Sequence, residues 1–286
     1  MTGMKEMNIL QVIYKFTLIV AVVNTYIMLL VIRFFVPLRK QMMFNRIYRL
    51  VYKLTEGTMR LFGKKRLNRK YDFRAFVAGF VLVLLYSAFW ARANIHHSYA
   101  EGVIYMFASF VTYSFYTMLF VFIAAFITAF NPLHAYGEAA RVIHLMSSTA
   151  IGFMKNIFSY AKRNYAPLVG IVLVIGINGI AMTGLSTLLG NAVAFVDNVI
   201  VGGKSALFLF TGMWILFIIV RQILTWTDVS EENFIHKNTI LLTEPLYMPF
   251  RKMFPPYRVG FDLSPLITIG LLSMIFLADL FLLKIK

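Results

Sequence analysis

Six long apolar stretches alternate with polar segments along this chain. A helix needs roughly 20 apolar residues to cross a hydrocarbon core about 30 Å thick, and each stretch reaches about that length. The pattern therefore predicts an all-α membrane protein with six transmembrane helices. Their expected bounds are about 10–35, 73–91, 103–130, 167–189, 205–226 and 263–283.

The segment between the first two stretches has a different pattern. One helix face is shared by Ile47, Leu50, Val51, Leu54, Thr58, Leu61 and Phe62. The basic residues off that face and just beyond it are Arg46, Arg49, Lys53, Arg60, Lys64, Lys65, Arg66, Arg69 and Lys70. This pattern predicts a basic amphipathic helix over 44–62 that lies in the headgroup plane with its apolar face toward lipid. Similar spacing predicts a second amphipathic helix from Val142 to Phe158.

Composition agrees with a membrane protein and excludes a soluble globular enzyme. Hydrophobic residues make up 60% of the chain, charged residues only 14%, and the mean hydropathy is +0.75. The formal net charge is +16, from 28 Lys and Arg against 12 Asp and Glu. We expect anionic lipid headgroups, rather than nucleic acid, to bind these basic residues, because they lie beside apolar stretches. The chain has no Cys, which excludes disulfides and Cys-ligated metals.

The distribution of basic residues predicts an orientation. Most Lys and Arg residues lie in the segments that follow the first, third and fifth apolar stretches. The positive-inside rule therefore assigns these three segments to the cytoplasm and both termini to the opposite side. We expect a multi-pass protein of the bacterial inner membrane.

Similar short motifs recur along the chain and predict three tandem units, at 1–98, 99–200 and 201–286. Asp72, Asn164 and Asp262 each stand just before an apolar stretch, where a short polar side chain can cap the first turn of a helix. Leu54-Thr55-Glu56 and Leu242-Thr243-Glu244 precede the first and third of these caps. Each unit is expected to contain a span, an amphipathic cytoplasmic segment and a second span.

The C-terminal unit resembles the YggT (YlmG-like) family of small integral membrane proteins. The residues that carry this resemblance are Arg221, Trp226, Glu244, Pro245, Pro249, Arg251, Pro255, Pro256, Asp262, Ser264 and Pro265. The first unit resembles the family through Arg33, Glu56 and Asp72, and the middle unit through its cap and Pro167. The resemblance implies an inner-membrane or plastid-membrane protein. Different lineages of the family are associated with osmotic and cation homeostasis, cell division, nucleoid distribution or assembly of a membrane cytochrome complex. The resemblance implies no enzymatic activity.

Individual polar residues allow more than one interpretation. Glu244 and Asp262 could form a catalytic carboxylate pair, but we expect Asp262 to cap a helix and Glu244 to meet Arg251. We expect Arg33 and Arg221, at the ends of spans, to extend toward lipid phosphate. The adjacent His96 and His97 point apart on a helix and do not favour a metal site. His134, His144 and His236 have no ligand spacing.

Two functions remain open at this point. The first is a scaffold or assembly factor that binds lipid headgroups and a membrane-protein partner, or a second copy of the chain, through its basic amphipathic segments. The alternative is an ion channel or transporter linked to cation or osmotic homeostasis, although the spans place few ionisable groups at depth. No Walker-type loop, His-Glu-x-x-His or Gly-x-Ser-x-Gly motif occurs in the chain, so we expect no catalytic residue, cofactor or metal.

Overall fold

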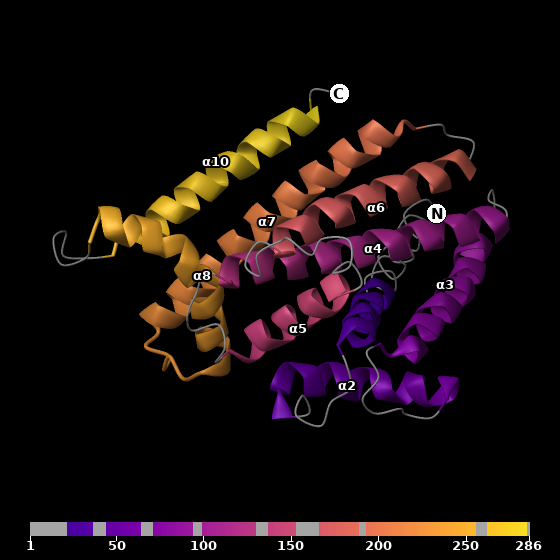
Figure 1. Ribbon diagram of the computed structural model, residues 1–286, viewed down its shortest axis with the longest axis horizontal. Coiled ribbons are helices and arrows are strands. Elements are labelled where there is room, and N and C mark those ends of the chain that lie inside the picture. Colours follow the sequence, from indigo (N-terminus) through magenta and orange to yellow (C-terminus); the bar gives the residue numbers. More distant parts are fainter. Residues whose placement is uncertain are drawn as a thin grey trace, which may run out of the picture. The chain divides into compact units, whose positions relative to one another are not determined.

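The computed structural model describes residues 22–36, 44–63, 71–93, 99–129, 137–152, 166–188, 193–255 and 262–284. These residues form helices and no strands, as the apolar pattern predicts. A helix at Val22–Phe35 is followed by α2 (Arg46–Met59), the 3-10 helix η2 (Arg60–Phe62), α3 (Phe73–Ala93), α4 (Tyr99–Thr128), α5 (Glu138–Gly152), α6 (Ala166–Leu188), α7 (Phe195–Trp226), α8 (Phe234–Met253) and α10 (Ser264–Lys284) (Figure 1).

Three helices in the described part of the chain are long and apolar enough to cross a membrane. They are α4, α6 and α7, with 30, 23 and 32 residues. Three shorter apolar helices, at Val22–Phe35, Phe73–Ser87 and Ser264–Ala278, lie in the other predicted stretches. The described part of the chain is therefore all-α with three candidate membrane spans, and the count of six spans stays a prediction.

Two compact units divide the chain. The first comprises residues 1–39 and 50–117, and the second comprises 40–49 and 118–286. These units are defined by packing, whereas the three tandem units were predicted from recurring motifs. The tandem organisation therefore stays a prediction.

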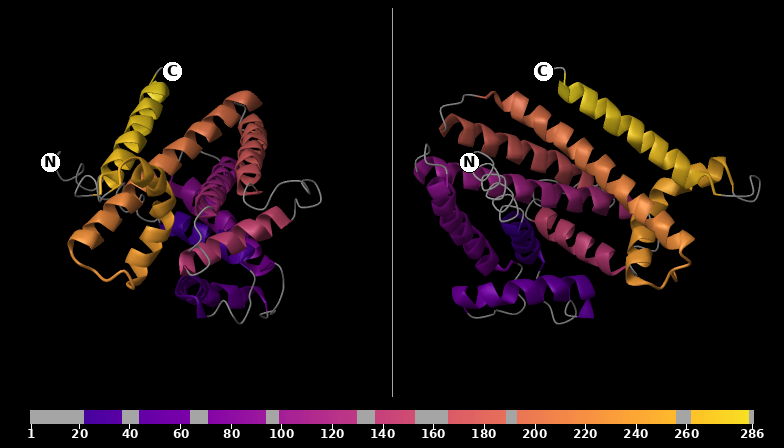
Figure 2. Two further views of the ribbon diagram at one scale, coloured as in Figure 1. Left: turned by 60° about the vertical axis from the view of Figure 1, so that its left-hand side comes forward. Right: turned by 180° about the vertical axis from the view of Figure 1, so that it is seen from behind.

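In the second unit, α7 packs between α6 and α10 and also contacts α8 (Figures 1 and 2). Two glycines of α6 allow its close packing: a Cβ on Gly170 would stand 2.7 Å from the Phe122 ring, and one on Gly179 would stand 2.6 Å from Val199. Small residues let the backbones of membrane helices approach one another in this way. Trp214 of α7 is fully buried, and its ring lies 5.1 Å from Phe210.

The starts of the three amphipathic helices α2, α5 and α8 meet in the second unit. Asn45 accepts a hydrogen bond from the Tyr48 N–H at 3.0 Å, which caps α2, and donates one to the Glu138 carbonyl oxygen at 2.7 Å. The Glu138 carboxylate accepts from the Arg46 N–H at 2.5 Å. The Asn238 side chain of α8 accepts from the Ala139 N–H at 3.1 Å. We call these contacts the helix-start junction.

In the first unit, a small apolar core joins three helices. Leu30 of the helix Val22–Phe35, Met59 of α2, and Ala75 and Ala78 of α3 are buried together. The Tyr26 hydroxyl also donates to Thr58 Oγ1 at 2.5 Å. Residues 50–59 of α2 therefore pack against two apolar helices of the same unit.

The predicted apolar face of α2 is divided between buried and exposed residues in the structure. The buried residues are Tyr48, Val51, Thr55 and Met59, whereas Leu50, Leu54 and Leu61 are 59%, 53% and 80% exposed. Val51 of the predicted apolar face is therefore buried within the chain, whereas its leucines are exposed, and contact of these leucines with lipid stays a prediction. Thr55 lies on the buried side because it bonds with Arg33.

Candidate functional site

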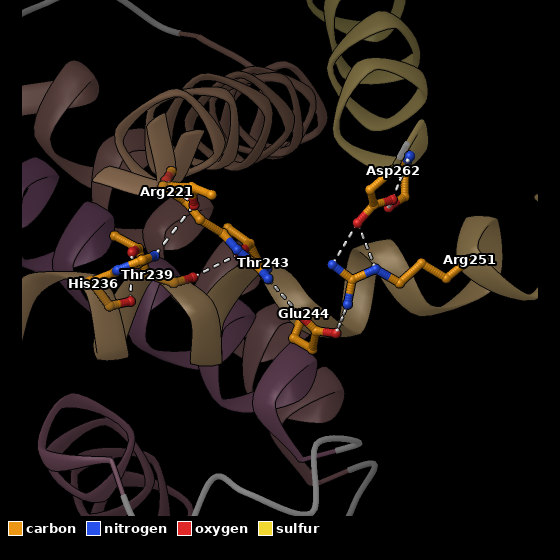
Figure 3. Close-up of polar contacts among 9 residues, drawn as sticks. Arg221, His236, Thr239, Thr243, Glu244, Arg251 and Asp262 are labelled. Carbon is orange, nitrogen blue, oxygen red and sulfur yellow. Dashed lines mark hydrogen bonds and ion pairs between the residues drawn. The ribbon is translucent and has the colours of Figure 1, made fainter. Parts of the chain in front are cut away.

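A cluster of charged residues connects the last turns of α7 to α8. Arg221 of α7 is buried, and its Nη1 donates to Thr243 Oγ1 at 2.8 Å. Its Nη2 donates to Glu244 Oε2, also at 2.8 Å (Figure 3). Both acceptors lie on α8, so a single guanidinium joins the two helices with one neutral and one charge-assisted hydrogen bond.

The same cluster continues from α8 to the start of α10. Arg251 donates to Glu244 through Nη1, and to Asp262 Oδ2 through Nε at 2.8 Å and Nη2 at 2.7 Å. Figure 3 shows Glu244 between the two arginines and Arg251 between the two carboxylates. We call Arg221, Thr243, Glu244, Arg251 and Asp262 the C-terminal cluster.

Asp262 also stabilises the first turn of α10, as expected from the sequence. Its Oδ1 accepts from the Ser264 N–H at 3.0 Å and from the Ser264 hydroxyl. Burial by itself raises the pKa of Asp262, but the hydrogen bonds from Ser264 and Arg251 outweigh burial. The pKa of Asp262 therefore lies below its ordinary value, and the carboxylate stays charged at the positive end of the helix.

An aromatic ring lies under both arginines of this cluster. Tyr247 is fully buried, and its ring centre lies 4.6 Å from Cζ of Arg221 and 5.7 Å from Cζ of Arg251. Both distances are in the range of cation–π attraction. Burial raises the pKa of the Tyr247 hydroxyl. Tyr247 therefore remains a neutral platform for the two guanidinium groups.

The comparison with protein families identifies this segment. Residues 204–282 match the model of the CCB3/YggT family. Over this C-terminal segment the chain is similar to the YggT family. This match confirms the resemblance seen in the sequence, and it includes the whole C-terminal cluster. No curated protein and no solved structure matches the chain.

The prolines of the YggT segment have a structural counterpart in α8. Pro245 and Pro249 lie inside this helix, where a proline has no N–H to donate and disturbs the carbonyls of the preceding turn. The Trp214 Nε1–H donates to the Leu242 carbonyl oxygen, in the turn before Pro245, at 3.1 Å. A side chain of α7 thus bonds with a backbone carbonyl of α8 in the turn before Pro245.

The remaining motif residues are more dispersed. Trp226, the last residue of α7, is 78% exposed and contributes to neither the charges nor the core of the cluster. Pro265 lies in the first turn of α10, where the missing N–H costs no hydrogen bond. Pro255 follows α8, and Pro256 lies outside the described residues.

A related cluster occurs in the first unit. Arg33 donates through Nη2 to Glu56 Oε2 at 2.8 Å, through Nε to Asp72 Oδ2 at 3.2 Å and through Nη1 to Thr55 Oγ1 at 3.5 Å. Arg74 adds two hydrogen bonds to Asp72, both at 2.9 Å. We call Arg33, Thr55, Glu56, Asp72 and Arg74 the N-terminal cluster.

The two clusters share their spacing and their chemistry. In each, the arginine bonds with a threonine 22 residues later and a glutamate 23 residues later. In each, the guanidinium also lies over a tyrosine ring, which for Arg33 is Tyr52 at 4.0 Å. Burial alone raises the pKa of Asp72, but Arg74 and Arg33 lower it below its ordinary value.

The expectation that Arg33 and Arg221 extend toward lipid phosphate was wrong. The Arg33 side chain is fully buried and the Arg221 side chain is 10% exposed, and both contact carboxylates of the chain. Their positions at the ends of apolar stretches could not distinguish the two outcomes. The decisive signal was the recurring Thr-Glu pair, which supplies an internal partner for each arginine.

The basic residues that we predicted to face lipid lie in two groups. Arg46, Arg49, Lys53 and Arg60 are exposed on α2 and η2, and Arg46 also forms an ion pair with Glu138 at 3.8 Å. The others, Lys64, Lys65, Arg66, Arg69 and Lys70, lie outside the described residues.

The histidines that the structure describes each bond with a nearby group and do not converge. His144 Nε2 lies 3.0 Å from Thr128 Oγ1, and His236 Nδ1 lies 2.8 Å from the Val229 carbonyl oxygen. His96, His97 and His134 lie outside the described residues.

Several residues of the site were missed by reasoning from the sequence. The sequence pattern assigns no separate role to Trp214 or Tyr247, and Glu138 and Asn238 belong to no motif. A polar residue just before an amphipathic segment, such as Asn45, was the available signal for the helix-start junction. The partners across that junction lie about 90 or more positions apart in sequence, with separations of 93 and 99 residues.

Proposed function

We propose that this membrane protein is a non-enzymatic scaffold or assembly factor, in which the C-terminal cluster holds α8 in a defined position for a partner in the membrane. The observation that carries the proposal is the complete pairing of charges in the cluster. Its two arginines and two carboxylates sum to zero, and each charge has an opposite charge within hydrogen-bond distance.

Paired charges of this kind favour a positional role over transport. A transporter uses ionisable groups that can exchange a partner for an ion or proton. Here Glu244 accepts from two arginines, and Asp262 accepts from Arg251 and Ser264. Releasing Glu244 would leave the buried guanidinium of Arg221 without its carboxylate partner, which is costly. An ion channel or transporter therefore remains the alternative and not the preferred function.

The helix-start junction supports the same proposal. It connects the first turns of α2, α5 and α8, and these helices lie in the segments that the positive-inside rule assigns to the cytoplasm. A connected set of amphipathic helices gives a stable surface for a partner. At the far end of α8, Met253 and Phe254 are exposed beside Lys252, and this end is the surface that we propose for contact.

Two measurements on the full chain test the proposal. A photo-crosslinking amino acid at Met253 should give a discrete membrane-protein adduct in cells, and Arg251→Gln should reduce the yield because it releases the end of α8. The same amino acid at Val172, exposed on α6, is the matched control and should give no such adduct.

The alternative is tested by reconstitution. Vesicles that contain the purified protein should conduct K⁺, Na⁺ and H⁺ no faster than vesicles without protein. An ion flux that Glu244→Gln abolishes, together with no adduct from Met253, would reject the scaffold and favour the channel.

A further inference from the structure

Helix α2 has three faces in the structure. At about 100° per residue, the buried residues Val51, Thr55 and Met59 lie on one side. Leu50 and Leu54 form an exposed apolar stripe, and Leu61 of η2 continues it. A second exposed stripe is basic and consists of Arg49, Lys53 and Arg60.

The two exposed stripes are neighbours but do not mix. By the same rotation, each spans an arc of about 40°, and their centres lie about 100° apart. Both are turned more than 100° from the centre of the buried face. A helix with this division can lie along a surface with its leucines on one side and its cations on the other.

The acidic residue of α2 is paired with an arginine of another helix. Glu56 is the single Asp or Glu in Arg46–Met59, and its carboxylate contacts Arg33, leaving 13% of the side chain exposed. Glu56 is a helical neighbour of Lys53 and Arg60, but its charge is paired with Arg33, so the exposed surface of α2 carries a net positive charge. Its charge complements an anionic surface.

The other two amphipathic helices do not expose a comparable pair of stripes. On α5, the exposed residues among those described are Arg141 and Ser148. Most of the apolar face of α8 is buried, including Leu241, Leu242 and Tyr247. Within the described residues, α2 is thus the amphipathic helix that has exposed leucines beside exposed basic residues.

We propose that the exposed face of α2 docks on an anionic lipid leaflet, with Leu50, Leu54 and Leu61 inserted among the acyl chains and Arg49, Lys53 and Arg60 at the phosphates. The inference rests on the proposed membrane scaffold and names a ligand for one of its amphipathic helices. The short connections of α2 to two apolar helices support this position, since they hold α2 close to the membrane. Because the leucines are next to the cations, insertion and headgroup contact can occur together.

The absence of native cysteine allows a direct test on the full chain. A single nitroxide at Leu54→Cys in nanodiscs with phosphatidylglycerol should collide more often with oxygen, which concentrates in lipid, than with a water-soluble nickel chelate. In phosphatidylcholine nanodiscs this preference should be weaker. Raising the salt from about 0.1 M to about 1 M, which shortens the Debye length from about 10 Å to about 3 Å, should weaken it in phosphatidylglycerol as well.

Variants separate the role of charge from that of folding. With about a fivefold preference from each surface cation, Arg49→Gln, Lys53→Gln and Arg60→Gln together should lower the ratio of docked to undocked α2 on the order of 100-fold. The matched control, Lys237→Gln with Lys252→Gln, removes cations from α8 and should leave the Leu54 label unchanged. A label at Ser148→Cys should not respond to lipid charge.

Two outcomes would overturn the proposal. One is equal lipid exposure of the Leu54 label in neutral and anionic nanodiscs, and the other is full lipid exposure in the triple Gln variant. Neither would affect the adduct from Met253 or the ion-flux measurement, because α2 contributes no residue to the C-terminal cluster. Failure of this inference and failure of the proposed function are therefore distinguishable.

Discussion

The N-terminal and C-terminal clusters use the same residue types in different arrangements. In the N-terminal cluster, Arg33 contacts both carboxylates directly, and Arg74 bonds with Asp72 alone. In the C-terminal cluster, Arg221 contacts Glu244 alone, and Arg251 connects Glu244 to Asp262. The second guanidinium comes from the start of the following helix in one cluster and from the amphipathic helix in the other.

This difference changes how firmly each amphipathic helix is held. Helix α2 supplies one charged residue, Glu56, to its cluster, whereas α8 supplies both Glu244 and Arg251. Trp214 adds a further hydrogen bond to α8. The two clusters share the spacing of Arg, Thr and Glu. The amphipathic helix supplies one charged residue to the cluster when the second arginine lies on the following helix, and two when that arginine lies on the amphipathic helix itself.

The largest expected effect comes from removing the arginine that serves two carboxylates. Arg33→Met should lower the free energy of unfolding by about 3–5 kcal/mol, because Glu56 loses a buried partner. Arg221→Met should cost only about 1–3 kcal/mol, since Glu244 keeps Arg251. Denaturant unfolding in detergent, followed by circular dichroism, measures both values. Equal losses would show that the two arrangements are energetically equivalent.

The extra connection of α8 predicts an intermediate effect. Trp214→Phe removes the N–H that bonds with the Leu242 carbonyl while keeping an aromatic ring in the core. We expect a loss of about 0.5–1.5 kcal/mol, the net contribution of one hydrogen bond. Trp226→Phe is the matched control, because Trp226 is 78% exposed, and it should unfold like the wild type. If both variants unfold alike, the Trp214 hydrogen bond does not hold α8.

Acid should produce the smallest effect of the three. The pKa values of Asp72 and Asp262 are both lowered in the folded protein. Their stabilisation is therefore present above the unfolded pKa of about 3.9 and is lost as the pH falls through the lower folded values. As the pH is lowered from about 6 to about 3, the unfolding midpoint of the wild type should fall. The midpoints of Asp72→Asn and Asp262→Asn should fall less over the same range. If the midpoint of a variant falls as steeply with pH as that of the wild type, the aspartate replaced in that variant does not cause the loss of stability in acid.

The sequence was informative about elements and caps because these depend on local chemistry. Apolar runs set the helices α4, α6 and α7, and the polar residue before α10 identified its first turn. The C-terminal motif also pointed to the contact of Glu244 with Arg251, since both lie seven residues apart on one helix. The family resemblance rested on the same short-range pattern.

The sequence was less informative about faces and partners. The hydrophobic pattern of α2 contains Leu50, Val51, Thr55 and Met59, and more than one rotation of the helix buries a reasonable set of them. Packing against Leu30 and the bond from Arg33 to Thr55 select one rotation and leave the leucines exposed. Periodicity defines the angles between side chains of one helix, but not which side another helix covers.

By itself, then, the sequence determined that the chain is helical, apolar enough for a membrane, and similar to the YggT family in its C-terminal segment. Only the tertiary structure decided that Arg33 and Arg221 turn inward and that α2 exposes its leucines. The physical reason is that a long arginine side chain can reach either lipid phosphate or a carboxylate of the chain. The choice depends on whether folding brings a carboxylate within about 3 Å of the guanidinium, because that hydrogen-bonded pair compensates the loss of water.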